Sequence, residues 1–418
     1  MKTCITLVFV FFISFIHAQI HKEIAEIFIN DLSREKYQEA ESLTDSIFQK
    51  SANENVLKTI WLQANQQLGT YNQIDSSKKY NNQAYIVFID FAKAKQKFII
   101  SFNKDGKIVG MGNGGTFFKK SKTDDTLAFL QKDLAIQVKG GRIYGSLLMP
   151  KNSNKQTPLA LIIAGSGPTD RNGNDNALGL NCYSYQMLAD SLARNGIASF
   201  RYDKRFSGKS VESTFDKAKF SFDNYVGDAD SIALFFKTKY SKIYVIGHSE
   251  GSLVGILLSQ KESLAGFISL AGAGENIALT LKRQLAQMPD TAEVARVLSN
   301  LQNGKTVDSV PANLQLIFSS SVQPYLISWM KYDPQKEIAK LRCPILILQG
   351  NHDMQVTVQD AQNLKAGSRS AHLVIIDSMN HILKNVPMDK MQNIATYSNP
   401  NLPLNKELIN AIVSFIKK

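Results

Sequence analysis

Six short apolar runs between residues 159 and 377, separated by helical patterns, limit the fold more than any other feature. They are LALIIAG (159–165), ASFRYD (198–203), IYVIGH (243–248), FISLAG (267–272), ILILQG (345–350) and LVIID (373–377). Their apolar residues are continuous rather than alternating, which is typical of strands covered on both faces. Helical stretches such as MLADSLARNG and DADSIALFFKTK lie between them. The pattern therefore predicts a mostly parallel sheet with helices, the alpha/beta class.

Two further features complete this region, which we place at residues 126–418. A hairpin, LAIQV followed by RIYGSLLMP, comes before the runs. Residues 275–341 contain no strand signal but carry helical stretches, so they predict a helical insertion that is a candidate cap over a site. A packing insertion without substrate contact is the alternative. The large apolar residues of the insertion suit either an acyl pocket or the interior of the cap. They are Phe318, Tyr325, Trp329 and Met330.

The chain before residue 119 predicts a separate, smaller unit. Helix-like spacing over residues 20–68 is followed by strand patterns at 85–91, 97–102 and 107–109. Helices followed by antiparallel strands indicate a small α+β domain at residues 19–118, joined to the larger domain by a polar linker at 119–125. Residues 110–115 match G-x-G-x-x-G literally, but no apolar helix follows them, so a flexible turn is expected there.

The N-terminus has the pattern of a secretory signal peptide over residues 1–18. One lysine precedes an apolar stretch at 5–16, which is shorter than the roughly 20 residues that cross a bilayer. Ala18 then offers a cleavage point, so export to the periplasm or the exterior is expected, with an uncleaved anchor as the alternative. The remaining cysteines, Cys182 and Cys343, have no metal-ligand spacing, and their pairing stays open.

The net charge of +12 does not by itself identify a partner. No run of five like charges occurs, so the lysines are dispersed over the surface. A nucleic-acid groove needs basic residues clustered with aromatic ones, and the sequence therefore argues against nucleic acid as a partner. After the N-terminal segment no stretch is long and apolar enough to span a membrane, and the oligomeric state stays open.

Residues 247–251, Gly-His-Ser-Glu-Gly, carry the strongest functional signal. This G-x-S-x-G directly follows a strand run and opens a helical pattern, SLVGILLSQ, which is the context in which the motif presents a nucleophile. The flanking glycines suit a sharp elbow that leaves no room for Cβ atoms. Ser249 is therefore the predicted nucleophile, and an idle serine in a glycine-rich turn is the alternative.

A serine nucleophile needs a base, and around this motif the acid and then the base follow the serine in chain order. Asp353 comes just past one strand run, and His381 just past the next, so each lies in a loop at a strand end. His352 precedes the acid, and His372 begins its strand on the wrong side of the sheet. Asp377 is the rival acid, but it is too near His381 in sequence to orient it easily. We predict Asp353 as the acid and His381 as the base, against a helix-capping aspartate and a hydrogen-bonded loop histidine.

Acyl transfer also requires N–H groups for the oxyanion. The Glu250 N–H lies at the elbow, at the positive end of the predicted helix. The loop Gly165-Ser166-Gly167-Pro168 follows the first parallel strand, and the Ser166 N–H is the best second donor by position. A plain tight turn is the alternative for this loop.

Several stretches together carry a resemblance to a known family. They are GSGPTDRNGN (165–174), SFRYDKRFSGKS (199–210), GHSEG (247–251), ISWMKYDP (327–334), GNHDMQV (350–356) and MNHILK (379–384). On these, residues 126–418 resemble an alpha/beta-hydrolase, within a group of bacterial serine esterases that have a GSGP-type oxyanion loop. In that group a glycine usually follows the segment matching YDKR, whereas here Phe206 and Ser207 stand. Residues 20–118 more weakly resemble a cystatin-like or NTF2-like module.

The resemblance implies hydrolysis of a small-molecule carboxylic ester through a Ser–Asp–His triad and an acyl-enzyme, with no metal or cofactor. Together with the signal pattern, it leads us to expect an exported serine esterase. A serine peptidase or amidase with the same triad is the first alternative. A binding or envelope-scaffold protein with an idle hydrolase fold is the second.

Overall fold

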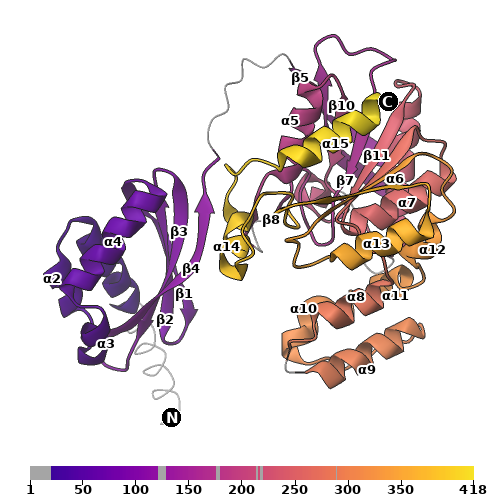
Figure 1. Cartoon of the computed structure of the whole chain (residues 1–418). Coiled ribbons are helices and arrows are strands. Elements are labelled where there is room, and N and C mark those ends of the chain that lie inside the picture. Colours follow the sequence, from indigo (N-terminus) through magenta and orange to yellow (C-terminus); the bar gives the residue numbers. More distant parts are fainter. Residues whose placement is uncertain (1–19, 121–128, 176–178, 213–214, 217–219, 289) are drawn as a thin grey trace, which may run out of the picture. The chain divides into compact units, whose positions relative to one another are not determined.

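The computed structural model describes residues 20–120, 129–175, 179–212, 215–216, 220–288 and 290–418. The chain divides into two compact units (Figure 1). The first takes in Met1–Lys122 together with Ser398–Asn401, and the second comprises Thr123–Tyr397 and Leu402–Lys418. The predicted signal peptide and most of the predicted linker lie outside the described residues. Among the helices that are described, none has the length and apolar character needed to cross a membrane.

The first unit has helices on one face of an antiparallel sheet (Figure 1). Residues 20–33 form a helix, followed by α2 (Tyr37–Ser42), α3 (Ser46–Ser51) and α4 (Glu54–Leu68). The strands β1 (Tyr71–Asn81), β2 (Ala84–Phe91), β3 (Ala94–Phe102) and β4 (Ile108–Phe118) pair in chain order. Alternate residues of β2 and β3 are buried against the helices, with Phe28, Leu57 and Phe91 in the core. The expected small α+β domain is confirmed.

Two parts of this sheet differ from the sequence prediction. Strand β1 was not expected, because its sequence is almost entirely polar and most of it is exposed at the sheet edge. Residues 110–115 are not a flexible turn but lie inside β4, where Gly112 pairs with Ile99 of β3. Close packing requires a glycine at Gly114, since a Cβ there would lie 3.1 Å from the Lys97 Cβ, whereas a Cβ at Gly110 would meet no atom within 4 Å.

The second unit contains an eight-stranded sheet in the order β14-β13-β12-β11-β7-β10-β6-β5. Its strands are β5 (Phe129–Val138), β6 (Gly141–Pro150), β7 (Leu159–Ile163), β10 (Ala198–Tyr202), β11 (Ile243–His248), β12 (Gly266–Leu270), β13 (Ile345–Gly350) and β14 (His372–Ile376). Strand β6 pairs antiparallel with β5 and β10, and all other neighbours are parallel. A short ribbon of β8 (Asn174–Asp175) and β9 (Leu180–Asn181) stands apart.

Both faces of this sheet are covered, which explains the continuous apolar runs. In β7, Leu161 and its alternate neighbours join one core cluster, whereas Ile162 and its neighbours join another. Helices α5 (Ser184–Arg194) and α15 (Lys406–Lys417) cover the second cluster. Helices α6 (Phe222–Lys237), α7 (Glu250–Lys261) and α13 (Val358–Gly367) cover the first. The predicted alpha/beta class is confirmed.

Helices occupy the long interval between β12 and β13 (Figure 1). They are α8 (Ile277–Gln284), α9 (Thr291–Gln302), α10 (Gln315–Phe318), α11 (Gln323–Trp329) and α12 (Pro334–Ile338). Tyr325 stacks on Phe220 and Trp329 on Phe222, each with ring centroids 5.3 Å apart. Tyr325 and Trp329 of the insertion therefore pack against the start of α6 and the residues before it.

Candidate active site

A sharp turn from β11 into α7 presents Ser249. Its φ of 53° and ψ of −119° lie outside the regions that L-residues normally occupy. The flanking glycines are required by contact, because a Cβ at Gly247 would lie 2.2 Å from the Gly251 carbonyl oxygen. A Cβ at Gly251 would lie 2.3 Å from the Ile163 carbonyl oxygen. The local sequence thus forms the elbow that the motif predicts.

Asp353 and His381 meet at the carboxyl ends of β13 and β14. The His381 Nδ1 and the Asp353 Oδ2 are 2.8 Å apart. The other carboxylate oxygen of Asp353 accepts the backbone N–H groups of Gln355 and Val356. Burial alone would raise the pKa of Asp353, but His381 and these N–H groups outweigh it, and the pKa is lowered. The rival Asp377 is exposed and bonds to Asn351 instead.

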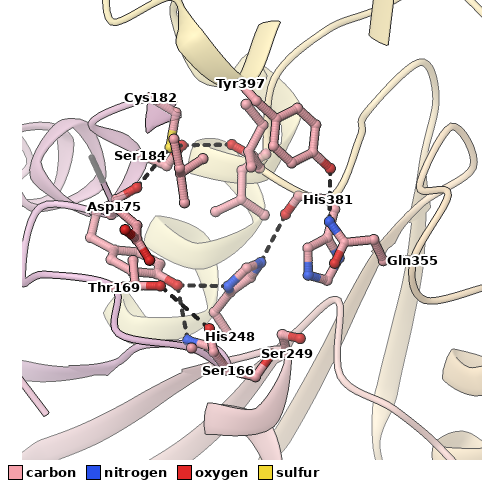
Figure 2. Close-up of a pocket in the computed structure, with 17 residues that line it drawn as sticks. Ser166, Thr169, Asp175, Cys182, Ser184, His248, Ser249, Gln355, His381 and Tyr397 are labelled. Carbon is pink, nitrogen blue, oxygen red and sulfur yellow. Dashed lines mark hydrogen bonds between the residues drawn. The ribbon is translucent and has the colours of Figure 1, made fainter. Parts of the chain in front are cut away.

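One cavity of about 320 Å³ brings Ser249 and His381 together (Figure 2). Because ionised Asp353 can only accept, the His381 Nδ1 carries the ring proton in the neutral form. The Nε2 atom is therefore the nitrogen left to accept a proton from a hydroxyl. The cavity is lined by residues 165–167, Thr169, Gly173, Asp175, Leu180, Cys182, Ser184, Tyr185, His248, Ser249, Gln355, residues 381–383 and Tyr397.

Two backbone N–H groups beside Ser249 are available to bind an anion. Within the described part of the chain, neither the Ser166 N–H nor the Glu250 N–H has a hydrogen-bond acceptor. The loop that carries Ser166 lies against the elbow, since a Cβ at Gly165 would be 3.1 Å from the Ser249 Cβ. Glu250 begins α7, so its N–H lies at the positive end of the helix. Both candidate donors thus lie next to the candidate nucleophile.

Two comparisons with known proteins indicate the family to which the second unit is similar. Residues 178–385 match the family described as serine aminopeptidase, S33, and this span includes Ser249, Asp353 and His381. Esterase EstD from Thermotoga maritima is 23% identical over 392 residues, covering 88% of this chain and 90% of that protein. The second unit has the alpha/beta-hydrolase fold. The resemblance of residues 126–418 to an alpha/beta-hydrolase is thereby confirmed.

Solved structures similar to this alpha/beta-hydrolase include two esterases. Est1E from Butyrivibrio proteoclasticus is 18% identical, with a TM-score of 0.46, over 68% of this chain and 99% of that one. Pyrococcus furiosus esterase Pf2001 is 16% identical, with a TM-score of 0.45, over 72% of this chain and 94% of that one. Residues 25–111 match a family described as a protein of unknown function, DUF3887.

His248, the residue before the candidate nucleophile, is buried in a chain of hydrogen bonds (Figure 2). Its Nε2 lies 2.8 Å from the His381 carbonyl oxygen, which can only accept, so this nitrogen carries the proton. Its Nδ1 accepts from the Tyr185 hydroxyl at 2.7 Å. That hydroxyl oxygen accepts the Gly165 N–H at 3.0 Å. This series of hydrogen bonds connects the Gly165 loop to the backbone of His381.

Because His248 is buried, we expect it to make the folded protein less stable at acidic pH. Burial, reinforced by His381, lowers the pKa of His248 from 6.5 to about 3. At pH values between about 3 and 6.5, His248 is protonated in the unfolded chain but neutral in the folded chain, so lowering the pH favours unfolding. For this group the loss from pH 7 to pH 4.5 is about 2.5 kcal/mol. Glutamine keeps one donor and one acceptor but does not titrate. From pH 7 to pH 4.5, a His248→Gln variant should therefore lose about 2.5 kcal/mol less of its free energy of unfolding than the wild type.

The measurement is urea unfolding at the two pH values. Trp329 lies in the second unit and Trp61 in the first, so a Trp61→Phe background makes the fluorescence report on the hydrolase unit. Equal pH-dependent losses with and without the His248→Gln substitution would contradict the assignment.

The sequence missed several residues that shape the site. Tyr185, Gln355 and Tyr397 line the cavity, and Gln355 donates to the Tyr397 hydroxyl at 3.0 Å. No quoted stretch contains Tyr185 or Tyr397. Gln355 lies within GNHDMQV, but nothing in that stretch indicates that its side chain lines the cavity. As far as the structure describes it, the cavity lining contains no residue of the 275–341 insertion. Cys182, at the cavity wall, and Cys343 are both free thiols.

The loop after β10 keeps a glycine-like backbone without the usual glycine. Phe206 takes a left-handed φ of 63°, which costs a non-glycine residue roughly 1 kcal/mol. Its ring packs edge-on against Phe215 and Phe220. Gly208 follows with a φ of 45°, and a Cβ there would meet the Asp203 carboxylate at 2.3 Å from its Cγ. Aromatic packing thus holds the conformation that a glycine would adopt freely.

Proposed function

We propose that this chain hydrolyses carboxylic esters, with Ser249 as nucleophile, His381 as general base and acid, and Asp353 as the group that orients His381. The observation that carries the proposal is the shared cavity. It contains Ser249 on a strained elbow, a His381 imidazole fixed by Asp353, and N–H groups without an acceptor in the described structure.

In the first half-reaction, the Ser249 Oγ attacks the ester carbonyl carbon while the His381 Nε2 takes its proton. The carbonyl oxygen becomes an oxyanion and is bound by the Ser166 and Glu250 N–H groups. The ionised Asp353 stabilises the imidazolium through Nδ1. Collapse of the tetrahedral intermediate expels the alcohol, which takes the proton from His381, and leaves an ester on Ser249.

In the second half-reaction, water replaces the alcohol. The His381 Nε2 removes a proton from the water as it attacks the acyl-enzyme carbonyl, and the same N–H groups bind the second oxyanion. Collapse returns the proton to the Ser249 Oγ and releases the carboxylic acid. No cofactor is needed, since every proton and bond is accounted for by these side chains, the ester and water.

The chain is a hydrolase of the carboxylesterase type, as the sequence predicts, and its curated relative EstD is named an esterase. The cavity supports a small substrate, because about 320 Å³ is at the lower end of the range for small-molecule sites. Leu180, Ile382 and Leu383 give its wall an apolar part that suits an acyl or alkyl group.

Amide cleavage is the second candidate, because the matching family is described as serine aminopeptidase. The same triad serves both reactions, and they differ in the leaving group that His381 must protonate.

We further propose that residues 1–18 direct export and that residues 19–118 form a module distinct from the catalytic domain at 126–418. Both proposals rest on the sequence pattern.

A fluorophosphonate probe combined with a substrate panel tests the proposed function. The probe should label the wild-type chain at Ser249, and Ser249→Ala should abolish both labelling and turnover. Esters of short acyl chains should have a higher kcat/KM than the matched aminoacyl amides. The reverse order would assign the chain as an amidase. Folded wild-type protein that takes up no probe would contradict a serine mechanism altogether and favour a binding role.

A further inference from the structure

Lys204 is a buried lysine that the proposed mechanism does not use, and it contacts the segments that form the candidate oxyanion site. Lys204 follows β10 and is 2% exposed. Its Nζ donates to the Gly165 carbonyl oxygen at 2.5 Å and to the Glu250 Oε1 at 3.1 Å. The same ammonium lies 4.6 Å from the centroid of the Tyr225 ring. Lys204 therefore contacts both segments that supply the proposed oxyanion donors.

The contact with Gly165 acts on the Ser166 N–H directly. The Gly165 carbonyl and the Ser166 N–H belong to one peptide unit, and the described chain has no cis peptide bond. In a planar trans peptide the C=O and N–H point in opposite directions. Fixing the carbonyl on the Lys204 ammonium therefore fixes the direction of the N–H on the other side. The positive charge also polarises this peptide and strengthens its N–H as a donor.

The contact with Glu250 acts on the second donor through its own side chain. Glu250 is 4% exposed, and its Oε2 accepts from the Tyr325 hydroxyl at 2.5 Å. Burial raises the pKa of Tyr325, so this hydroxyl keeps its proton and donates. Lys204 on one side and Tyr325 on the other thus hold the residue whose N–H opens α7.

We propose that Lys204 is a positioning residue that sets the two oxyanion donors, through the Gly165 carbonyl and the Glu250 carboxylate, at a fixed separation. This inference rests on the proposed function. Lys204 is therefore expected to affect stabilisation of the transition state. The two N–H groups are correctly placed to bind an oxyanion only while Lys204 holds together the segments that carry them. Substrate binding, which precedes formation of the oxyanion, depends on them much less.

A set of neutral variants tests the role without leaving a buried charge unpaired. Lys204→Met alone would strand the Glu250 carboxylate, so Lys204→Met is combined with Glu250→Gln, which keeps the Glu250 N–H. Loss of oxyanion alignment should lower kcat by about 100-fold and change KM by less than about threefold. The inhibition constant of an alkyl boronic acid, which forms a tetrahedral adduct, should rise in parallel, while that of the carboxylic acid product stays constant.

The neighbouring ion pair provides a matched control. Arg205 is also buried and pairs with Asp228, with its Nε 2.6 Å from Oδ2, but it bonds to the Lys139 carbonyl rather than to the oxyanion loop. Arg205→Met with Asp228→Asn should cost comparable thermal stability and leave kcat within about threefold of wild type.

The outcomes separate this proposal from the proposed function. Wild-type kcat and boronate affinity in folded Lys204→Met/Glu250→Gln protein would overturn the positioning role, whereas Ser249→Ala would still be inactive. Equal losses of kcat in the control pair would overturn it too. If the methionine variant does not fold, Lys204→Leu/Glu250→Gln, which also removes the ammonium and its hydrogen bonds to Gly165 and Glu250, is judged by the same criteria.

Discussion

Replacing His381 by alanine is expected to lower kcat for ester hydrolysis by about 10⁶-fold, because nothing else in the described cavity takes the Ser249 proton. The second histidine of the cavity, His248, cannot substitute. Its Nε2 is bound to the His381 carbonyl and its Nδ1 to the Tyr185 hydroxyl. Labelling of Ser249 by the fluorophosphonate probe should fall with kcat, since both reactions need the activated hydroxyl.

The measurement is steady-state kinetics on the best ester, with thermal unfolding to verify the fold. His372→Ala is the matched control, because His372 is exposed at the start of β14, and its kcat should stay at the wild-type value. A folded His381→Ala chain with kcat within about tenfold of wild type would rule out His381 as the base.

Asp353→Asn should lower kcat by about 10⁴-fold while preserving the shape of the site. In the native chain the Asp353 Oδ1 accepts the N–H groups of Gln355 and Val356, at 2.8 and 3.0 Å. An asparagine would keep its oxygen toward these donors and turn its NH₂ toward the His381 Nδ1. That nitrogen must then accept, so the ring proton moves to Nε2, where it blocks the proton transfer from Ser249.

Asp377→Asn separates this effect from a general loss of negative charge. Asp377 lies in the loop that follows β14, is exposed, and bonds to Asn351 and Ser378. Its replacement should leave kcat unchanged. If Asp377→Asn reduced kcat and Asp353→Asn did not, the acid would be assigned to the wrong loop. Kinetics on one ester, at equal active-site concentration, distinguishes the two results.

The parts of the site that could be predicted are those governed by local rules. The elbow depends on the glycines on either side of Ser249, and the motif itself contains both. The contact that excludes a Cβ at Gly247 is with Gly251, whereas the one at Gly251 is with Ile163 of β7. Asp353 and His381 could be found because parallel strands deliver the residues at their carboxyl ends to one edge of the sheet. Those rules concern single strands and the residues that follow them.

The parts that escaped prediction depend on side chains meeting across long separations. Lys204 reaches Gly165 across 39 positions and Glu250 across 46, and Tyr185 reaches His248 across 63. Lys204 lies in the quoted stretch SFRYDKRFSGKS, but nothing in that stretch indicates which distant groups its ammonium contacts. Strand β1 escaped for another reason, since pairing with β2 supplies the stability that its polar side chains do not.

The first unit is discontinuous in sequence, because Ser398–Asn401 belong to it. The Asn401 Nδ2 donates to the Lys119 carbonyl oxygen at 2.9 Å, within that unit. Tyr397, which lines the cavity, is the residue immediately before this segment. A chain trimmed to residues 126–418 would therefore retain a fragment of the missing module, spliced between a cavity residue and the last helix. To exchange this module between related proteins, both the N-terminal segment and Ser398–Asn401 would have to be replaced together.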